Sequence, residues 1–174
     1  MYGIVSIMKI QILKTVLILL AIVICASAVF AQNRQLDRMM DFMGFLKRVD
    51  AAQLELQNGR PEAFKALWSQ SDDITLSGGF GGTIEKGWGT VSKRLDWVGR
   101  QFSNGTNTIE RLVAMSDQKL GYVVQLEHLR FKAAETKAEA TRDYRVTMIF
   151  RLEKDGWRIV HRQADSQFVK QAPK

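Results

Sequence analysis

The sequence predicts an α+β fold in which three N-terminal helices pack on a strongly curved antiparallel sheet. Two observations predict this class. Apolar residues recur at helical spacing between residues 36 and 102, whereas from residue 106 onward they alternate with a period of two. The alternating segments are long and joined by short turns, so neighbouring strands must pair antiparallel and the sheet must twist and bend. Helices that precede such a meander can cover only one of its faces.

The first 31 residues are typical of a secretory signal peptide. Lys9 and Lys14 precede an apolar run, TVLILLAIVICASAVF, and the small residues that follow favour cleavage after Ala31, with Ala28 as the second choice. Met8 is an alternative start. The competing interpretation is an uncleaved anchor, but this run has 16 residues and a spanning helix requires roughly 20. We therefore expect an exported protein, either periplasmic or secreted.

The segment after the predicted cleavage site, residues 32–174, is long enough for one domain and too short for two. Cys25 is the only cysteine, and the bulky Ile24 before it disfavours a lipoprotein site. Removal of the signal lowers the formal net charge from +7 to +5, because two lysines leave with it. The remaining basic residues alternate with acidic ones and form no stripe, so neither nucleic acid nor, after cleavage, a membrane is an expected partner.

The first helix is predicted to begin at Leu36 and to stop at Asn58-Gly59, a typical C-terminal signal. Its apolar positions fall on one face, and they are Leu36, Met39, Met40, Met43, Leu46 and Val49. A second, short helix follows Pro61, whose missing N–H costs nothing in a first turn. The residues that this helix is expected to bury are Phe64, Leu67 and Trp68.

The third helix has the most regular pattern in the chain, and Ser103-Asn104-Gly105 is expected to close it. Its apolar stripe is Trp88, Val91, Leu95, Val98 and Phe102. The segment DDITLSGG before it is interpreted as a strand. Four long strands then follow, roughly 106–116, 119–132, 138–152 and 156–168, separated by the turn signals SDQK, AAETKA and EKDG.

Residues 76–91, LSGGFGGTIEKGWGTV, hold six of the 13 glycines of the chain. A Walker loop requires Ser or Thr after its lysine, whereas Lys86 precedes Gly87, and the spacing Gly-x-Gly-x-x-Gly is absent. Both motifs also belong to parallel sheets. The stretch is therefore predicted to be a turn from strand to helix that carries Phe80 and Trp88 over whatever lies beneath, and no cofactor is expected.

Three stretches are similar to the nuclear transport factor 2-like superfamily, and within it to the SnoaL-like group. They are DDITLSGGFGGTIEKGWGTVSKRL (72–95), LGYVVQLEH (120–128) and YRVTMIFRLEKDGWRIVHRQAD (144–165). Relatives commonly read His-x-His-x-Asp in the third stretch, where this chain has Gln163 in place of the second histidine. The resemblance implies a cone with a pocket at its open end, often in a homodimer, and includes ketosteroid isomerase, polyketide cyclases and assembly domains. In the related association domain of a calmodulin-dependent kinase the equivalent arginine lines the pocket, which points to Arg145.

The last hairpin admits two registers, and they place different residues in the cavity. With a three-residue turn, Glu153 opposes Trp157, and one polar face carries Arg145, Thr147, His161, Gln163 and Asp165. With a four-residue loop, Leu152 opposes Trp157, and Arg145 and Thr147 move to the opposite face. We favour the first register.

The candidate catalytic residues are His161 and Asp165. Four residues of extended strand would separate them by about 13 Å, which excludes a direct hydrogen bond unless a bulge intervenes. Ketosteroid isomerase chemistry needs a carboxylate base and a neutral donor, for which Asp165 or Asp143 and Tyr122 or Tyr144 are candidates. No metal site is expected from two histidines on different strands.

Three functions follow from this interpretation. The preferred one is an exported, homodimeric domain that binds a small molecule in a conical pocket, and this ligand can be an anion. The residues predicted to line the pocket are Arg145, Thr147, Tyr122, Trp88 and Gln163. The alternatives are a lyase or isomerase in which His161 or Asp165 moves a proton, and a homodimeric assembly module without a ligand. Arg145 has a structural alternative too, an ion pair with Asp143, Glu139 or Asp165.

Overall fold

The computed structural model describes residues 30, 32–34, 36, 37, 39–166 and 168. The chain divides into a unit that ends at Arg38 and a second unit that begins at Met39, and the second unit carries the sheet. The predicted signal peptide lies outside the described residues except for Phe30. Among the residues described, no helix has both the length and the apolar character needed to cross a membrane.

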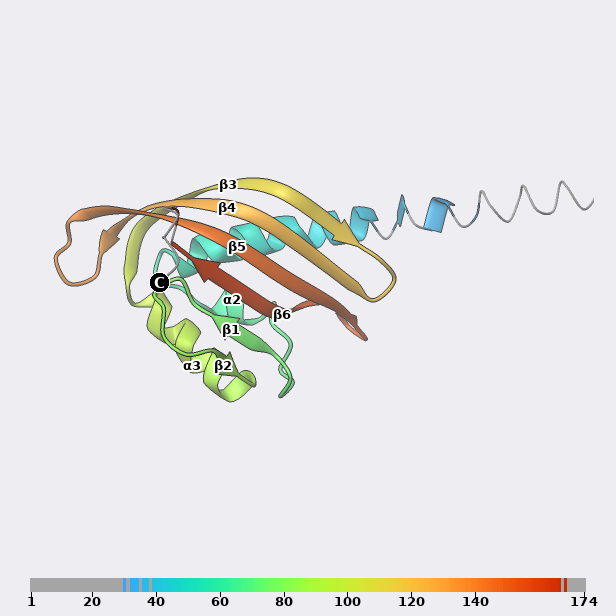
Figure 1. Cartoon of the computed structure of the whole chain (residues 1–174), viewed down its shortest axis with the longest axis horizontal. Helices are drawn as coiled ribbons and strands as arrows, with labels where there is room; N and C mark the ends of the chain where they lie inside the picture. The colour runs from blue at the N-terminus through green and yellow to red at the C-terminus, as the bar shows by residue number, and fades with distance from the viewer. Residues whose placement is uncertain (1–29, 31, 35, 38, 167, 169–174) are drawn as a thin grey trace, which may run out of the picture. The chain divides into compact units, whose positions relative to one another are not determined.

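The sheet has six strands in the order β2-β1-β6-β5-β4-β3. Their bounds are β1 Thr75–Ser77, β2 Glu85–Lys86, β3 Phe102–Ser116, β4 Leu120–Ala133, β5 Glu139–Glu153 and β6 Gly156–Asp165. Strands β3 to β6 form the predicted antiparallel meander, and Figure 1 shows the long strands β3, β4 and β5 bending over the helix that precedes α2. The sheet is nevertheless mixed, because β1 pairs parallel with β6, which the sequence did not predict.

Three helices cover one face of this sheet, as predicted. The first is continuous over residues 39–56, α2 spans Glu62–Lys65 and α3 spans Trp88–Gly99. The prediction that Ser103-Asn104-Gly105 closes α3 was wrong, since the helix stops at Gly99 and Phe102 already begins β3. Val91 and Leu95 of α3 are buried as expected.

The buried face of the first helix agrees with the predicted one at Leu46 and Val49, which are both buried, and differs from it nearer the N-terminus. Met39, Met40 and Met43 are exposed, whereas Phe42 and Phe45 are buried. Both phenyl rings pack edge-on against Phe150 of β5, with ring centroids 5.4 and 5.7 Å apart. Two aromatic side chains bury more apolar area than the methionines could, and this difference decides which side of the helix faces the sheet.

The hairpin between β5 and β6 contains both predicted registers. Its turn has two residues, Lys154 and Asp155, which is shorter than either prediction, and beside the turn Leu152 pairs with Trp157. Val160 then remains unpaired as a β-bulge. The bulge moves the remainder of β6 by one residue relative to β5.

Beyond the bulge the pairing is the one that we favoured, and its three pairs are Ile149 with His161, Thr147 with Gln163, and Arg145 with Asp165. We call the side of the sheet toward the helices the inner face and the opposite side the outer face. Val146, Met148 and Ala164 are buried on the inner face. The residues of the three named pairs alternate with these buried residues and therefore lie on the outer face.

Candidate functional site

A cavity of ≈ 50 Å³ lies between the inner face and the helices. Polar side chains reach it from three elements: Gln53 and Gln57 from the first helix and the turn after it, Tyr144 from β5 and Arg162 from β6. The residues Gly78, Gly79 and Phe80 line it from the loop after β1. The remainder of the lining is apolar, so the polar groups converge within an otherwise apolar enclosure. The lining is of the kind found in small-molecule sites, but the volume is far below the roughly 300–1,000 Å³ of such a site.

Glu127 of β4 is the buried carboxylate beside this cavity, with a side chain that is 0% exposed. Arg162 donates two hydrogen bonds to it, of 3.1 and 3.0 Å. The side-chain amides of Gln53 and Gln125 donate two more, of 2.5 and 2.7 Å. A buried charge is tolerated only when it is paired and hydrogen-bonded, and four donors satisfy both carboxylate oxygens.

The polar cluster continues toward β3 through Gln125, whose side-chain oxygen accepts hydrogen bonds of 3.1 and 3.0 Å from Arg111. Arg111 also forms an ion pair with Asp50 of the first helix at 2.7 Å. The cluster thus contains two cations and two carboxylates, and its formal charge is zero. It presents hydrogen-bonding groups to the cavity without an uncompensated charge.

Two buried amide oxygens of the cavity lining, Gln53 Oε1 and Gln57 Oε1, have no hydrogen-bond partner among the described residues, and the only group that offers the buried Tyr144 hydroxyl a hydrogen bond there is the Arg142 side chain. Unpaired buried polar atoms elsewhere in this part of the chain belong only to Trp68 and Asn107. Burial raises the pKa of the Tyr144 hydroxyl, and the positive charge of Arg142 and a hydrogen bond from its side chain oppose that shift. Tyr144 is therefore a neutral donor at physiological pH, and it lines the same cavity as the two amide oxygens.

The glycine stretch forms one wall of the cavity. A Cβ on Gly79 would lie 2.2 Å from the ring of Tyr144, so only glycine fits there. The next residue, Phe80, packs edge-on against Trp97 of α3, and the guanidinium of Arg142 lies 4.4 Å from its ring centroid. Arg94 fixes the loop from the other side through a 3.1 Å hydrogen bond to the Gly81 carbonyl. The stretch leads from strand to helix, as predicted, but it also contains the short strand β2, which pairs with β1 and which the sequence did not predict.

Most of the residues that the sequence singled out lie on the outer face instead of in this cavity. Arg145 is 53% exposed and pairs with Asp165, which is the structural alternative stated above. Thr147, Gln163 and Tyr122 share that face. Trp88 begins α3 and packs against the core without lining the cavity. Whether any of these residues contacts a ligand stays a prediction.

The candidate catalytic residues, His161 and Asp165, both lie on the outer face but contact different residues. His161 Nδ1 lies 2.7 Å from the Thr75 hydroxyl, and burial lowers its pKa. Asp165 accepts hydrogen bonds from Arg145. His128 lies 2.8 Å from Asp143 on the same face. Among the described residues, no three His, Cys, Asp or Glu side chains gather in a way that could hold a metal ion.

Sequence reasoning missed Glu127, Arg162 and Gln53. The sequence holds no clear signal for Glu127, because two of the four residues in its row, Val123, Gln125, Glu127 and Leu129, are polar, and the burial of this row is visible only in the structure. Arg162 could not be found from the sequence either. The bulge at Val160 places it on the inner face, opposite to the side that a regular strand from Trp157 would give.

Comparison with known proteins gives one family and a set of solved structures. The sequence signature of the SnoaL-like domain matches residues 46–167. Three structures with the same fold show low identity, which supports the fold alone. A search of curated protein sequences returned no match.

The first of these structures is a nuclear transport factor 2-like superfamily protein from Salmonella enterica, with a TM-score of 0.66, 15% identity, and coverage of 78% of this chain and 95% of that one. A nuclear transport factor 2-like protein with a cystatin-like fold from Novosphingobium aromaticivorans has a TM-score of 0.62 and 16% identity, and the match covers 82% of this chain and 90% of that one. A ketosteroid isomerase-like protein from Erwinia carotovora has a TM-score of 0.62 and 12% identity, and the match covers 75% of this chain and 97% of that one.

Proposed function

Since the chain belongs to the SnoaL-like domain family, we propose that it is a small-molecule-binding domain whose ligand occupies the cavity between the Glu127–Arg162 pair and the Gly78–Phe80 loop. The observation that carries this proposal is that two unpaired amide oxygens, from Gln53 and Gln57, and the Tyr144 hydroxyl line one cavity. A buried donor or acceptor without a partner costs about 1–3 kcal/mol. A ligand that hydrogen-bonds to all three would recover that cost. Export belongs to the proposal and rests on the N-terminal sequence alone.

The charges around the cavity favour an uncharged polar ligand over an anionic one. The Arg162 guanidinium is already paired with Glu127, and Arg111 is paired with Asp50. An anion would have to compete with a fully buried carboxylate for its cation. By contrast, one hydroxyl and two amide oxygens suit a small molecule that carries both hydrogen-bond donors and an acceptor.

The same geometry favours binding over proton transfer. A general base needs a free lone pair within reach of the substrate, whereas the Glu127 carboxylate accepts four hydrogen bonds from protein groups. His161 and Asp165 lie on the outer face, away from this cavity. The lyase or isomerase alternative therefore has less support than binding.

Replacement of Tyr144 by Phe tests the binding proposal. We expect a panel of small uncharged diols, amides and hydroxyketones to contain members that raise the Tm of the wild-type protein in a thermal-shift assay, and small carboxylates to give smaller effects. Tyr144→Phe should abolish the shift, because the ligand loses the hydroxyl. Tyr122→Phe, the same change on the outer face, is the matched control and should respond like wild type. Equal Tm shifts in the wild type and in Tyr144→Phe would contradict ligand binding in the cavity.

The outer face supports a second proposal, that the protein forms a homodimer. Several large apolar side chains are exposed at the end of the sheet that holds the β3–β4 turn: Leu112, Met115, Leu120, Tyr122 and Ile149. Four of them line an open depression of ≈ 460 Å³. Contiguous exposed apolar surface of this kind marks an interaction site, and a second copy would cover it with the same residues through a two-fold axis.

Ile149→Glu should convert such a dimer to a monomer, because a carboxylate at the centre of an apolar interface would be desolvated twice across the two-fold axis. Sedimentation velocity measures the outcome. Thr108→Glu, on the polar part of the same face, should leave the association unchanged. A wild-type protein that sediments as a monomer throughout the micromolar range would contradict the dimer.

A further inference from the structure

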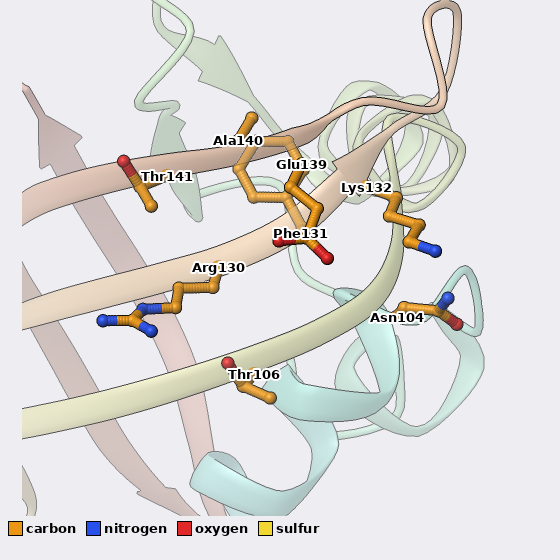
Figure 2. A pocket seen from close by; sticks show the side chains of 8 residues that line it. All are labelled: Asn104, Thr106, Arg130, Phe131, Lys132, Glu139, Ala140 and Thr141. Carbon is orange, nitrogen blue, oxygen red and sulfur yellow. The ribbon is translucent and has the colours of Figure 1, made fainter.

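A second depression on the outer face has a different chemistry from the apolar one. It measures ≈ 670 Å³, and we call it the basin. Its polar lining comes from three neighbouring strands, β3, β4 and β5, and consists of Asn104, Thr106, Arg130, Lys132, Glu139 and Thr141. Figure 2 shows Thr106, Arg130 and Thr141 side by side on these strands. No lining residue is shared with the interior cavity.

The register of the sheet sets the order of these groups. Arg130 pairs with Thr106 on one side and with Thr141 on the other, so an arginine lies between two threonines in one row of the sheet. In the next row outward-facing Lys132 pairs with Glu139. Directly opposed residues have Cβ atoms about 4.5–5.5 Å apart, so one small oxyanion could contact the Arg130 guanidinium and both hydroxyls together.

The cations of the basin differ from Arg145 and His128 on the same face in having no ionic partner in the part of the chain that the structure describes. Arg145 is paired with Asp165, and His128 contacts Asp143. Among the described residues, Arg130 and Lys132 make neither an ion pair nor a side-chain hydrogen bond. Glu139 is the only carboxylate in the lining, so the basin carries a net positive charge with the Arg130 guanidinium free to bind.

We propose that the basin is a binding site for a small oxyanion, a carboxylate or a phosphate group, with Arg130 as its anchor. A guanidinium binds the two oxygens of either group through parallel N–H bonds, and its planar fork fits carboxylate and phosphate geometry. Thr106 and Thr141 donate hydroxyl hydrogen bonds from either side, and Lys132 adds charge. Glu139 opposes the anion and limits its affinity.

The test is an NMR titration of the purified, ¹⁵N-labelled protein with sodium phosphate and, separately, with sodium acetate, at constant ionic strength held with sodium chloride. We expect at least one of the two anions to shift the amide resonances of Thr106 and Thr141 in a saturable manner. Saturation by phosphate alone identifies a phosphate group as the ligand, and saturation by acetate alone identifies a carboxylate. Shifts that stay linear with both anions would overturn the proposal.

Two variants separate a site from general charge screening. Arg130→Gln should weaken the binding about tenfold, because it removes a charge-assisted, bidentate contact. Lys119→Gln removes one exposed positive charge from the β3–β4 turn and should leave the binding unchanged. Glu139→Gln should tighten the binding about two- to fivefold, because a like charge is removed. Equal weakening by Arg130→Gln and Lys119→Gln would overturn the proposal.

Discussion

Arg162→Met is expected to lower the free energy of unfolding by about 3–5 kcal/mol, because it leaves the Glu127 carboxylate buried without its cation. Glu127 is fully buried and Arg162 is only 12% exposed, so water cannot replace the two lost hydrogen bonds. Urea unfolding followed by circular dichroism measures the change. A second substitution, Glu127→Gln, in the Arg162→Met background should restore most of the loss, because it removes the uncompensated charge.

The matched control for this prediction is Arg145→Met, which breaks an arginine–carboxylate pair on the other face of the same sheet. Both partners of that pair are largely solvated, and exposed pairs are worth about 0–1 kcal/mol. The two arginines therefore differ in burial and not in chemistry. Similar losses in Arg162→Met and Arg145→Met would contradict the assignment of Glu127 and Arg162 to a buried pair.

This contrast between Arg162 and Arg145 also shows what the sequence could predict. The alternation of the last two strands and their antiparallel pairing followed from the period of two. The sides of the β6 residues did not follow, because one bulge at Val160 reverses the second half of β6 relative to the first and brings His161 and Gln163 to the face of Arg145. A bulge is defined by two residues of one strand that oppose a single residue of its partner, so it cannot be recognised from the sequence of one strand alone.

The helices show a related limit. Their number and order were predicted from spacing and from the signals at Asn58-Gly59 and Pro61, whereas the predicted end of α3 was wrong. The buried side of the first helix was predicted only in part, because its N-terminal half contains two overlapping apolar stripes, one of methionines and one that includes Phe42 and Phe45. The contact with Phe150 decides between them, and that contact depends on the tertiary structure. Pairing of the short β1 with β6 is likewise a long-range contact without a local signal.

Gly79→Ala is the second change with a large expected effect, a loss of about 1–3 kcal/mol in the free energy of unfolding, because overpacking a buried contact forces the backbone or the ring to move. The added methyl group would lie 2.2 Å from the Tyr144 ring, and Tyr144 is only 4% exposed. Gly89→Ala is the control. Nothing lies within 4 Å of a Cβ at that position in α3, so alanine should stabilise the protein by up to about 1 kcal/mol through helix propensity.

A double-mutant cycle assigns the loss to this contact. In a Tyr144→Leu background the smaller side chain leaves room for the methyl group, so Gly79→Ala should cost less there than in the wild type, and the difference is the coupling energy. An equal cost in both backgrounds would mean that the loop is strained for another reason. If the coupling is present, the glycine of this turn is required by the close approach of the loop to Tyr144, the residue that supplies the hydroxyl of the proposed binding site.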